Sequence, residues 1–286
     1  MKKIFKAFLY FLLAVICIYI LFAFYYGGFG AKTLMYTSAS KSGQTLLFAH
    51  RGIYKYYPEN SRESIKGAKS HGFNAAEVDI RRSSDNQLII FHDENCGRLL
   101  GQDKNVSSMT VAELKKYPIR LKDGQKSQSF ILTVDELLAT EKEMVFYFDM
   151  KLSSFKDADD IVDLIMKYSA DQRVILASSN AALIFYVEAN YPGIMTVLEG
   201  FDSGKEWIHY LIPKELKPDF LSGFYSATNE AHVNWLKENN LLDSKIVYGV
   251  DLRNYKSALQ AGFKNILIDY DSVMEEDPEI KGLLCN

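Results

Sequence analysis

The sequence contains few cysteines, no excess of basic charge, and no internal repeat or low-complexity segment. Cysteine accounts for 3 of the 286 residues, which is too few for a framework of disulfide bonds. Cys17 lies in an apolar run, so Cys96 and Cys285 remain, either as two free thiols or as one bridge. The net charge is −3 and no basic patch dominates, so nucleic acid is not expected as a partner.

Long runs without charge are also rare, and the one that exists lies near the N-terminus. Residues 7–26 carry no charged side chain, and an apolar stretch of about 20 residues spans a bilayer as a helix. Lys2, Lys3 and Lys6 precede this run, and the positive-inside rule places such an end in the cytoplasm. We therefore expect a single-pass cell-membrane protein whose remaining chain lies outside the cytoplasm.

A cleaved signal peptide is the alternative to this anchor. The apolar part of a signal peptide usually has about 7–15 residues and precedes a cleavage site of small residues. The run here is longer, and Tyr25-Tyr26-Gly27-Gly28-Phe29 is not such a site. We favour an uncleaved anchor, which divides the chain into an anchor at 1–27, a tether at 28–44 and a folded domain at 45–286. Both alternatives place the folded domain outside the cytoplasm.

Along the folded domain, short apolar runs alternate with helical patterns. Strands are expected at 45–49, 75–80, 144–150, 173–177, 193–198, 219–222, 245–250 and 265–269. Helices are expected at 61–70, 111–117, 134–140, 157–168, 181–190, 232–239 and 255–260. This alternation predicts an α/β fold, a (β/α)₈ TIM barrel, and the length matches the ~250 residues typical of that fold. A loop-rich insertion is expected at about 95–132.

Charged side chains lie in or directly after several of the expected strands. His50 and Arg51 follow the first strand, and Glu77 and Asp79 lie two residues apart on the second. Because side chains alternate along a strand, the two carboxylates point to the same side. A charge at the end of a buried strand is costly unless it is paired or bound to a metal, so this placement indicates a polar site.

Three further residues extend the pattern. Asp149 and Lys151 repeat the two-residue spacing at the end of the third strand, and His92 follows a short extended run that begins at Gln87. In a TIM barrel, the chemistry gathers at the C-terminal ends of the strands, so we expect all these residues at one mouth. Taken singly, each residue has a structural explanation, such as a core histidine or a pair between Asp149 and Lys151. Their joint placement at strand ends is much harder to explain in that way.

The residue types favour phosphodiester chemistry. Carboxylates such as Glu77, Asp79 and Asp149 are the ligands that Mg²⁺ or Ca²⁺ prefers. Histidine titrates near neutral pH and suits acid/base catalysis, and side chains such as Arg51 and Lys151 suit a bound phosphate. The cations offset charge on the phosphate oxygens. One histidine can then take a proton from the attacking hydroxyl while the other gives a proton to the leaving alcohol.

In this order, the residues resemble the glycerophosphodiester phosphodiesterase family. The resemblance covers about residues 46–269, and residues 109–114 and 261–269 also look like family segments. The matching motifs are Ala49-His50-Arg51-Gly52, Pro58-Glu59-Asn60-Ser61, Glu77-Val78-Asp79, Phe91-His92-Asp93 and Phe148-Asp149-Met150-Lys151. The ordered set is specific, whereas no single motif would be.

The resemblance implies a metal-dependent enzyme that hydrolyses glycerophosphodiesters to an alcohol and glycerol 3-phosphate through a cyclic phosphate. Its substrate would be a small molecule, and its cofactor one divalent cation, Mg²⁺ or Ca²⁺. The implied roles are acid/base catalysis for His50 and His92, phosphate binding for Arg51 and Lys151, support for Glu59, and metal ligation for Glu77, Asp79 and Asp149.

Two positions depart from the family pattern. The family usually has glutamate where this chain has Asp149, and it often has a Trp-Thr pair where this chain reads Val247-Tyr248-Gly249-Val250. Two other functions therefore stay open. One is phospholipase D-type hydrolysis of a lysolipid at the membrane, and the other is a non-catalytic relative that binds a phosphate ligand.

Overall fold

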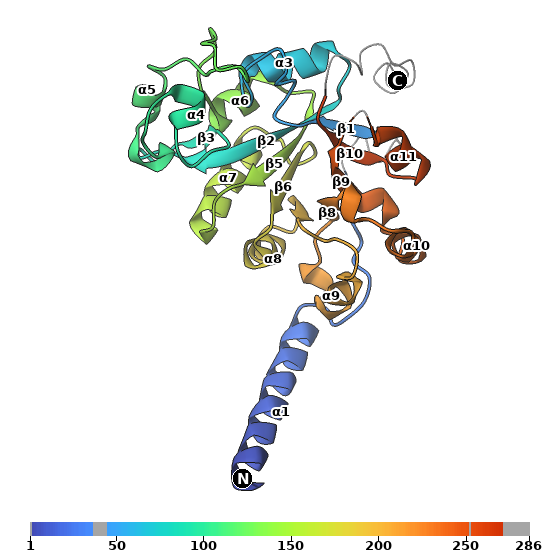
Figure 1. Ribbon diagram of the computed structural model, residues 1–286. Helices are drawn as coiled ribbons and strands as arrows, with labels where there is room; N and C mark the ends of the chain where they lie inside the picture. Colours follow the sequence, from blue (N-terminus) through green and yellow to red (C-terminus); the bar gives the residue numbers. More distant parts are fainter. Residues whose placement is uncertain (1, 37–44, 252, 271–286) are drawn as a thin grey trace.

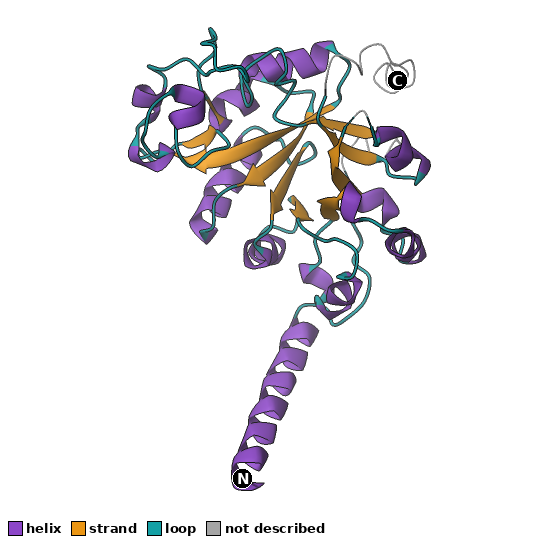
Figure 2. Ribbon diagram, viewed as in Figure 1, coloured by secondary structure: helices purple, strands orange, loops and turns teal. Residues whose placement is uncertain are grey.

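The computed structural model describes residues 2–36, 45–251 and 253–270, and its centre is a closed barrel of eight parallel strands (Figures 1 and 2). β1 pairs with β2 as well as with β10, which closes the ring. The strands run around the barrel in the order β1 (Leu46–Ala49), β10 (Asn265–Ile268), β9 (Lys245–Val250), β8 (Phe220–Phe224), β7 (Met195–Leu198), β6 (Val174–Ser178), β5 (Val145–Met150) and β2 (Ala75–Arg82). All eight strands expected from the sequence are present, so the prediction of a TIM barrel is confirmed.

Helices follow most of these strands and surround the barrel (Figure 2). Four begin with capping boxes, in which Ser61, Thr110, Thr133 and Ser154 each accept a hydrogen bond from the backbone N–H three residues later. The six-residue α9 and the four-residue α4 were not expected from the sequence. The helices are α1 (Lys2–Tyr25), α3 (Arg62–Ser70), α4 (Gly97–Leu100), α5 (Val111–Leu114), α6 (Val134–Thr140), α7 (Phe155–Lys167), α8 (Ala181–Asn190), α9 (Glu206–Leu211), α10 (Glu230–Glu238) and α11 (Tyr255–Gln260).

Large side chains fill the interior of the barrel. Phe48 and Tyr147 meet there with their ring centroids 5.9 Å apart, and Phe220 packs in the same cluster. The neighbours of Tyr147 on β5, Phe146 and Phe148, belong to the other apolar layer, between the strands and the helices. Because the interior is packed, polar chemistry is confined to the two ends of the barrel. We call the C-terminal ends of the strands the mouth and the N-terminal ends the floor.

The expected insertion lies between two short strands that extend the sheet beyond β2. β3 (Leu88–Ile90) pairs antiparallel with β2, and β4 (Leu132–Thr133) pairs antiparallel with β3. The intervening chain, with α4 and α5, has an apolar cluster of its own, which includes the buried Cys96. Cys285 lies outside the described residues, so the possible bridge between these two cysteines stays untested.

The N-terminal part of the chain extends from the barrel as a long helix, α1 (Figure 1). Its segment Ile4–Tyr25, with 22 residues and a mean hydropathy of 2.7, is long and apolar enough to cross a membrane. A signal sequence would have the same features. After α1, the chain contacts the barrel, where the N–H of Lys214 donates to the Gly28 carbonyl at 2.8 Å and the N–H of Met35 donates to Asp219 at 2.9 Å.

Candidate active site at the barrel mouth

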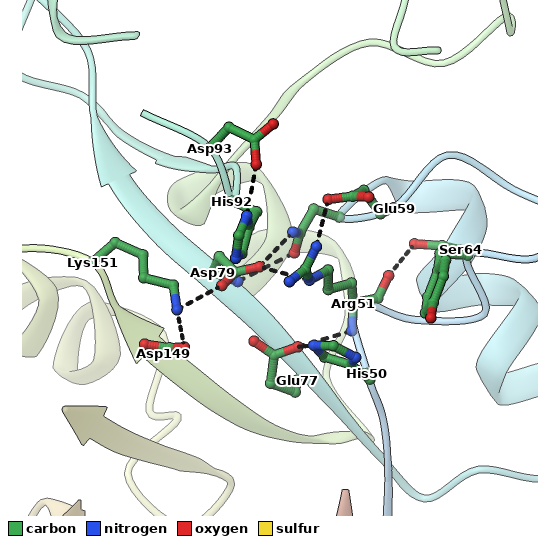
Figure 3. A network of polar contacts seen from close by, with 12 residues as sticks. His50, Arg51, Glu59, Ser64, Glu77, Asp79, His92, Asp93, Asp149 and Lys151 are labelled. Atoms are coloured by element: carbon green, nitrogen blue, oxygen red, sulfur yellow. Dashed lines mark hydrogen bonds and ion pairs between the residues drawn. The ribbon is translucent and has the colours of Figure 1, made fainter. Parts of the chain in front are cut away.

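The eight residues expected to form a site lie together at the mouth, as Figure 3 shows for their side chains. The register of the sheet accounts for part of this arrangement. β2 and β5 are adjacent and parallel, and Asp79 stands directly opposite Asp149. His50 and Arg51 directly follow β1, which pairs with the other edge of β2. Residues that are about 100 positions apart in the sequence therefore lie close together at the mouth, because their strands are neighbours in the barrel.

Three carboxylates form the centre of the site. Glu77, Asp79 and Asp149 each offer an oxygen atom, and these oxygens lie within 4.8 Å of one another. The side chains of Glu77 and Asp79 are buried. Burial and the charges of Asp79 and Asp149 raise the pKa of Glu77 well above its usual value, and burial also raises the pKa of Asp149. A divalent cation prefers such a set of oxygen ligands, and its charge would relieve this repulsion.

Two positive side chains offset part of the negative charge. Lys151 forms a short ion pair with Asp149 and lies 3.3 Å from Asp79. Although burial lowers the pKa of Lys151, the two carboxylates raise it above its usual value. On the other side, Arg51 Nε lies 3.4 Å from Asp79 Oδ2, and an N–H group of the same guanidinium donates to Glu59 Oε1 at 3.0 Å. Lys151 and Asp149 do pair, as the simpler explanation proposed, but they do so inside the carboxylate cluster.

His50 is held by a residue from the opposite end of the sequence. Its Nδ1 lies 2.5 Å from Asp269 Oδ1, directly after β10, and Asp269 also accepts a hydrogen bond from Tyr54 at 3.2 Å. Although burial raises the pKa of Asp269, the bond from His50 lowers it below its usual value. The His50 Nε2 atom lies 3.9 Å from Glu77 Oε2. Asp269 therefore orients the ring so that Nε2 faces the carboxylates.

His92 has a matching partner on the other side of the site. Its Nδ1 lies 2.7 Å from Asp93 Oδ1, and Figure 3 shows the ring between Asp93 and Asp79. Arg98 donates to both oxygens of Asp93, at 2.7 and 2.9 Å. Although burial raises the pKa of Asp93, these bonds lower it to about 2. Both histidines thus have a carboxylate at Nδ1, which leaves Nε2 to act in the site.

Glu59 connects the two halves of this network. It accepts hydrogen bonds from Arg51 and from both terminal nitrogens of Arg98, the latter at 2.7 and 2.8 Å. Arg98 in turn holds Asp93, so Glu59 links the Arg51 side of the site to the His92 side. Arg98 lies on the four-residue helix α4, in the insertion, where the sequence carries no period that could reveal it. For that reason, Arg98 is not among the residues expected from the sequence to form the site.

The backbone between β1 and α3 is bent to bring Arg51 and Asn60 into place. Arg51, Gly52 and Asn60 all have positive φ angles, of 53°, 72° and 56°. A Cβ atom on Gly52 would lie 2.6 Å from the Ser64 backbone, so glycine is required there. Asn60 donates to Asp79 Oδ2 at 2.8 Å and accepts from the Asp79 N–H at 3.2 Å. Ser61 is the N-cap of α3, and the adjacent Asn60 positions a carboxylate.

Glu199 is a further acidic residue at the mouth that the sequence did not indicate. It follows β7 and accepts a hydrogen bond from the Tyr147 hydroxyl at 2.6 Å, while that hydroxyl also lies 3.1 Å from Ser222 Oγ. Burial and the neighbouring charge of Asp149 raise the pKa of Glu199 to about 7. A single glutamate after a short strand forms no motif, so only the closed barrel reveals its proximity to Asp149 and Lys151.

Comparison with known proteins agrees with this geometry. Residues 50–271 match the model of the glycerophosphoryl diester phosphodiesterase family. A glycerophosphodiester phosphodiesterase of Caldanaerobacter subterraneus subsp. tengcongensis is 29% identical over 143 residues, or 48% of this chain and 59% of that protein. A human protein named lysophospholipase D GDPD3 is 21% identical, over 59% of this chain and 56% of its own length. The chain thus spans somewhat more than half the length of these relatives.

Solved structures share the fold. A phosphodiesterase of Oleispira antarctica, in complex with the product sn-glycerol-3-phosphate, superimposes with a TM-score of 0.70 at 20% identity, over 86% of this chain and 99% of that one. A glycerophosphodiester phosphodiesterase of Thermotoga maritima gives 0.65 at 23% identity, over 79% and 95% of the two chains. At these identities the likeness establishes the TIM barrel and nothing finer.

Proposed function

The chain belongs to the glycerophosphoryl diester phosphodiesterase family, and on that premise we propose that it hydrolyses glycerophosphodiesters to an alcohol and glycerol 3-phosphate. One observation carries the proposal: the carboxylates Glu77, Asp79 and Asp149 are clustered within 4.8 Å, between two histidines that are each oriented by an aspartate. Such a set combines a cation site with an acid/base pair, which is what displacement at a phosphodiester needs.

Glu77, Asp79 and Asp149 would hold one divalent cation, Mg²⁺ or Ca²⁺. When bound, the cation supplies positive charge for the phosphate oxygens. Two buried carboxylates and the half-buried Asp149 fit such an ion, because burial and the charges of Asp79 and Asp149 raise the pKa of Glu77 even with Lys151 and Arg51 beside the cluster. The oxygen-only ligand set is consistent with either metal.

Arg51 and Lys151 would bind the phosphate. The buried Arg51 Nε makes no hydrogen bond within the described residues, although it lies 3.4 Å from Asp79. A donor is therefore left for a phosphate oxygen. Lys151, with its raised pKa, keeps its charge at neutral pH and can neutralise charge that develops on the phosphate during the reaction. Glu59 supports Arg51 through their 3.0 Å hydrogen bond.

His50 and His92 would perform the proton transfers. In the first step, one histidine takes the proton of a glycerol hydroxyl, whose oxygen forms a bond to phosphorus as the bond to the leaving alcohol breaks. The other histidine protonates that alcohol, and a cyclic phosphate results. Water then opens the ring with the two proton transfers reversed. Asp269 and Asp93 stabilise each imidazolium as it forms, because each accepts a hydrogen bond from the Nδ1–H group and stays negatively charged.

The N-terminal helix supports a proposal on location. We infer a single-pass anchor at residues 1–27 with a cytoplasmic N-terminus, a tether at 28–44 and an extracytoplasmic barrel at 45–286. The support is the apolar segment Ile4–Tyr25 together with the lysines that precede it. An anchored barrel lies close to lipid, and one relative is named a lysophospholipase D. Hydrolysis of a lysolipid is therefore the second candidate function.

The test is glycerol 3-phosphate release by the full chain in phospholipid nanodiscs. Activity on a panel of glycerophosphodiesters should disappear with EDTA and return with Mg²⁺ or Ca²⁺. His50→Ala should lower kcat by about 10²–10⁴, whereas the matched control His71→Gln, at the end of α3 and outside the site, should not. Faster release of free choline from a lysolipid would favour the second candidate. A folded, metal-loaded protein that cleaves neither substrate would contradict both.

A further inference from the structure

Three large apolar side chains are exposed on one short helix, α9. Trp207 is 61% exposed, Tyr210 54% and Leu211 49%. His209 of the same helix is buried, with its ring centroid 5.6 Å from that of Trp235 on α10 (Glu230–Glu238). The Tyr210 hydroxyl accepts a 2.8 Å hydrogen bond from Trp235 Nε1. The helix is therefore fixed, and its outer side presents a tryptophan, a tyrosine and a leucine together. We call these three residues the α9 face.

The α9 face lies beside the end of α1, as Figure 1 shows for the two helices. The Tyr19 hydroxyl of α1 donates a short hydrogen bond to the Leu211 carbonyl of α9. Directly after α1, the Glu215 N–H donates to the Tyr26 carbonyl at 3.1 Å and the Lys214 N–H donates to the Gly28 carbonyl at 2.8 Å. Contacts from Tyr19 within α1 and from Tyr26 and Gly28 directly after it thus hold the end of α1 against α9 and the residues that follow α9.

The position of Tyr19 sets the depth of α9 relative to a membrane. The apolar segment Ile4–Tyr25 has 22 residues, which at 1.5 Å per residue makes about 33 Å, close to the ~30 Å of a bilayer's hydrocarbon core. Tyr19 precedes Tyr25 by six residues, or about 9 Å along the helix. If α1 spans the bilayer, its contact with Leu211 lies about 9 Å inside the outer end of the apolar segment, within the ~5–10 Å to which interfacial helices bury their apolar face.

We propose that the α9 face is a membrane-contact surface, which inserts into the interfacial layer of the same phospholipid bilayer that α1 crosses. Tryptophan and tyrosine are enriched at that level because an apolar ring and a polar atom are both satisfied there. Lys205 and Lys214 flank α9 with about half of each side chain in solvent, beside Asp202 and Glu215, so that their stems can lie along the apolar layer with the charges at headgroup level. The proposal rests on the anchor role of α1 and is independent of the proposed hydrolysis.

The membrane contact would give the barrel a second attachment besides α1. A barrel joined to the bilayer by one helix could turn about that helix, whereas the α9 face next to it fixes which side of the barrel meets the lipid. The mouth would then keep a constant orientation to the surface. A barrel attached through α1 alone would have no such constant orientation.

Tryptophan fluorescence tests the proposal, because the chain has 2 tryptophans, Trp207 and Trp235, and α1 has neither. The full chain is placed in phosphatidylcholine nanodiscs whose acyl chains are brominated close to the headgroup. In Trp235→Phe, about half of the Trp207 emission should be quenched, because a side chain on an interfacial helix lies ~5–10 Å inside the boundary. Trp207→Phe is the matched control, and its remaining Trp235 should be quenched much less. If Trp235→Phe misfolds, the wild-type spectrum minus that of Trp207→Phe reports Trp207.

Each other outcome overturns the proposal. Quenching of Trp207 by aqueous iodide, with none by bromolipid, would show that the α9 face stays in water. Protection from both quenchers would show that a second copy or another protein covers it. Extraction of the full chain from membranes by alkaline carbonate would overturn the anchor itself along with this proposal. Glycerol 3-phosphate release, measured on the same samples, shows separately whether the proposed hydrolysis holds.

Discussion

The barrel holds buried carboxylates at both of its ends. At the floor, Glu188 and Asp219 meet Lys32, which forms an ion pair with each of them. Thr196 donates to both carboxylates, through its hydroxyl to Glu188 and its N–H to Asp219, and the Met35 N–H donates to Asp219 as well. All four carboxylate oxygens of the floor therefore have a donor from the chain.

The mouth differs in this respect. Glu77 Oε2 accepts from the Arg51 N–H, and Asp149 Oδ2 accepts from Lys151. Within the described residues, Glu77 Oε1 and Asp149 Oδ1 receive no hydrogen bond. The comparison teaches that buried acidic residues do not by themselves indicate a metal site. The floor is a completed structural network, whereas the mouth keeps acceptor oxygens for a ligand that the chain does not supply.

The largest stability effect is expected at the floor. Lys32→Met removes the cation shared by Glu188 and Asp219, and breaking a buried pair in this way should cost about 3 kcal/mol of unfolding free energy at neutral pH. Activity per folded molecule should not change, because the mouth is untouched. Denaturant unfolding measures the cost. Lys156→Met is the matched control, since Lys156 pairs with Asp160 on the surface, and it should cost less than about 1 kcal/mol. Equal losses in the two variants would contradict a buried floor network.

A neutral side chain at the mouth is expected to increase the stability of the protein without metal, whereas the change at the floor decreases it. The pKa of Glu77 is raised in the folded protein, so the folded state binds the proton of Glu77 more tightly than the unfolded state does. The contribution of Glu77 to stability therefore falls as the pH rises from its unfolded pKa to its folded pKa. In EDTA at neutral pH, Glu77→Gln should therefore raise Tm, by about 2–4 °C for each kcal/mol of relieved repulsion. The gain should shrink at acidic pH. Asp93→Asn gives the contrast: although burial raises the pKa of Asp93, its bonds from Arg98 and His92 lower it to about 2, so this variant should lower Tm, and calorimetry compares the two.

The smallest effect concerns the departure from the family at position 149. Asp149→Glu restores the longer side chain that the family resemblance leads us to expect, and one more methylene extends the carboxylate toward the other two ligands. We expect divalent metal binding to tighten by about tenfold or less, or ~1.4 kcal/mol. Titration calorimetry measures this affinity, with Asp149→Asn as the control that should weaken binding. Weaker binding in Asp149→Glu would show that the site is adapted to aspartate.

Much of the fold follows from patterns that are local in the sequence. The eight strands are short apolar runs between helical stretches, and the expected bounds of α6, α8 and α11 agree with the structure. The site residues were predictable because they occupy strand ends, and parallel strands bring their ends to one rim. The two-residue spacing alone predicted that Glu77 and Asp79 point to the same side, while the pairing of β2 with β5 places Asp149 opposite Asp79.

The remaining features depend on contacts between distant segments. Asp269 holds His50 from the last strand, and Arg98 reaches Asp93 and Glu59 from a four-residue helix. Arg98 stands in no periodic pattern, and although Asp269 ends an expected strand, its bond to His50 is visible only in the folded chain. Lys32 lies in the segment expected to be a tether, and its two carboxylate partners are more than 150 positions away in the sequence. Only the folded chain shows that this segment contributes to the floor.

The most direct measurement is calorimetric titration of the full, EDTA-treated chain with Ca²⁺ and with Mg²⁺, in parallel on Asp79→Asn and Glu188→Gln. Asp79 belongs to the mouth cluster, and Glu188 is a buried carboxylate of the floor. We expect one bound cation per chain in the wild type, no binding in Asp79→Asn and unchanged binding in Glu188→Gln. Binding that survives in Asp79→Asn, or that is lost in Glu188→Gln, would contradict the claim that the mouth is the metal site.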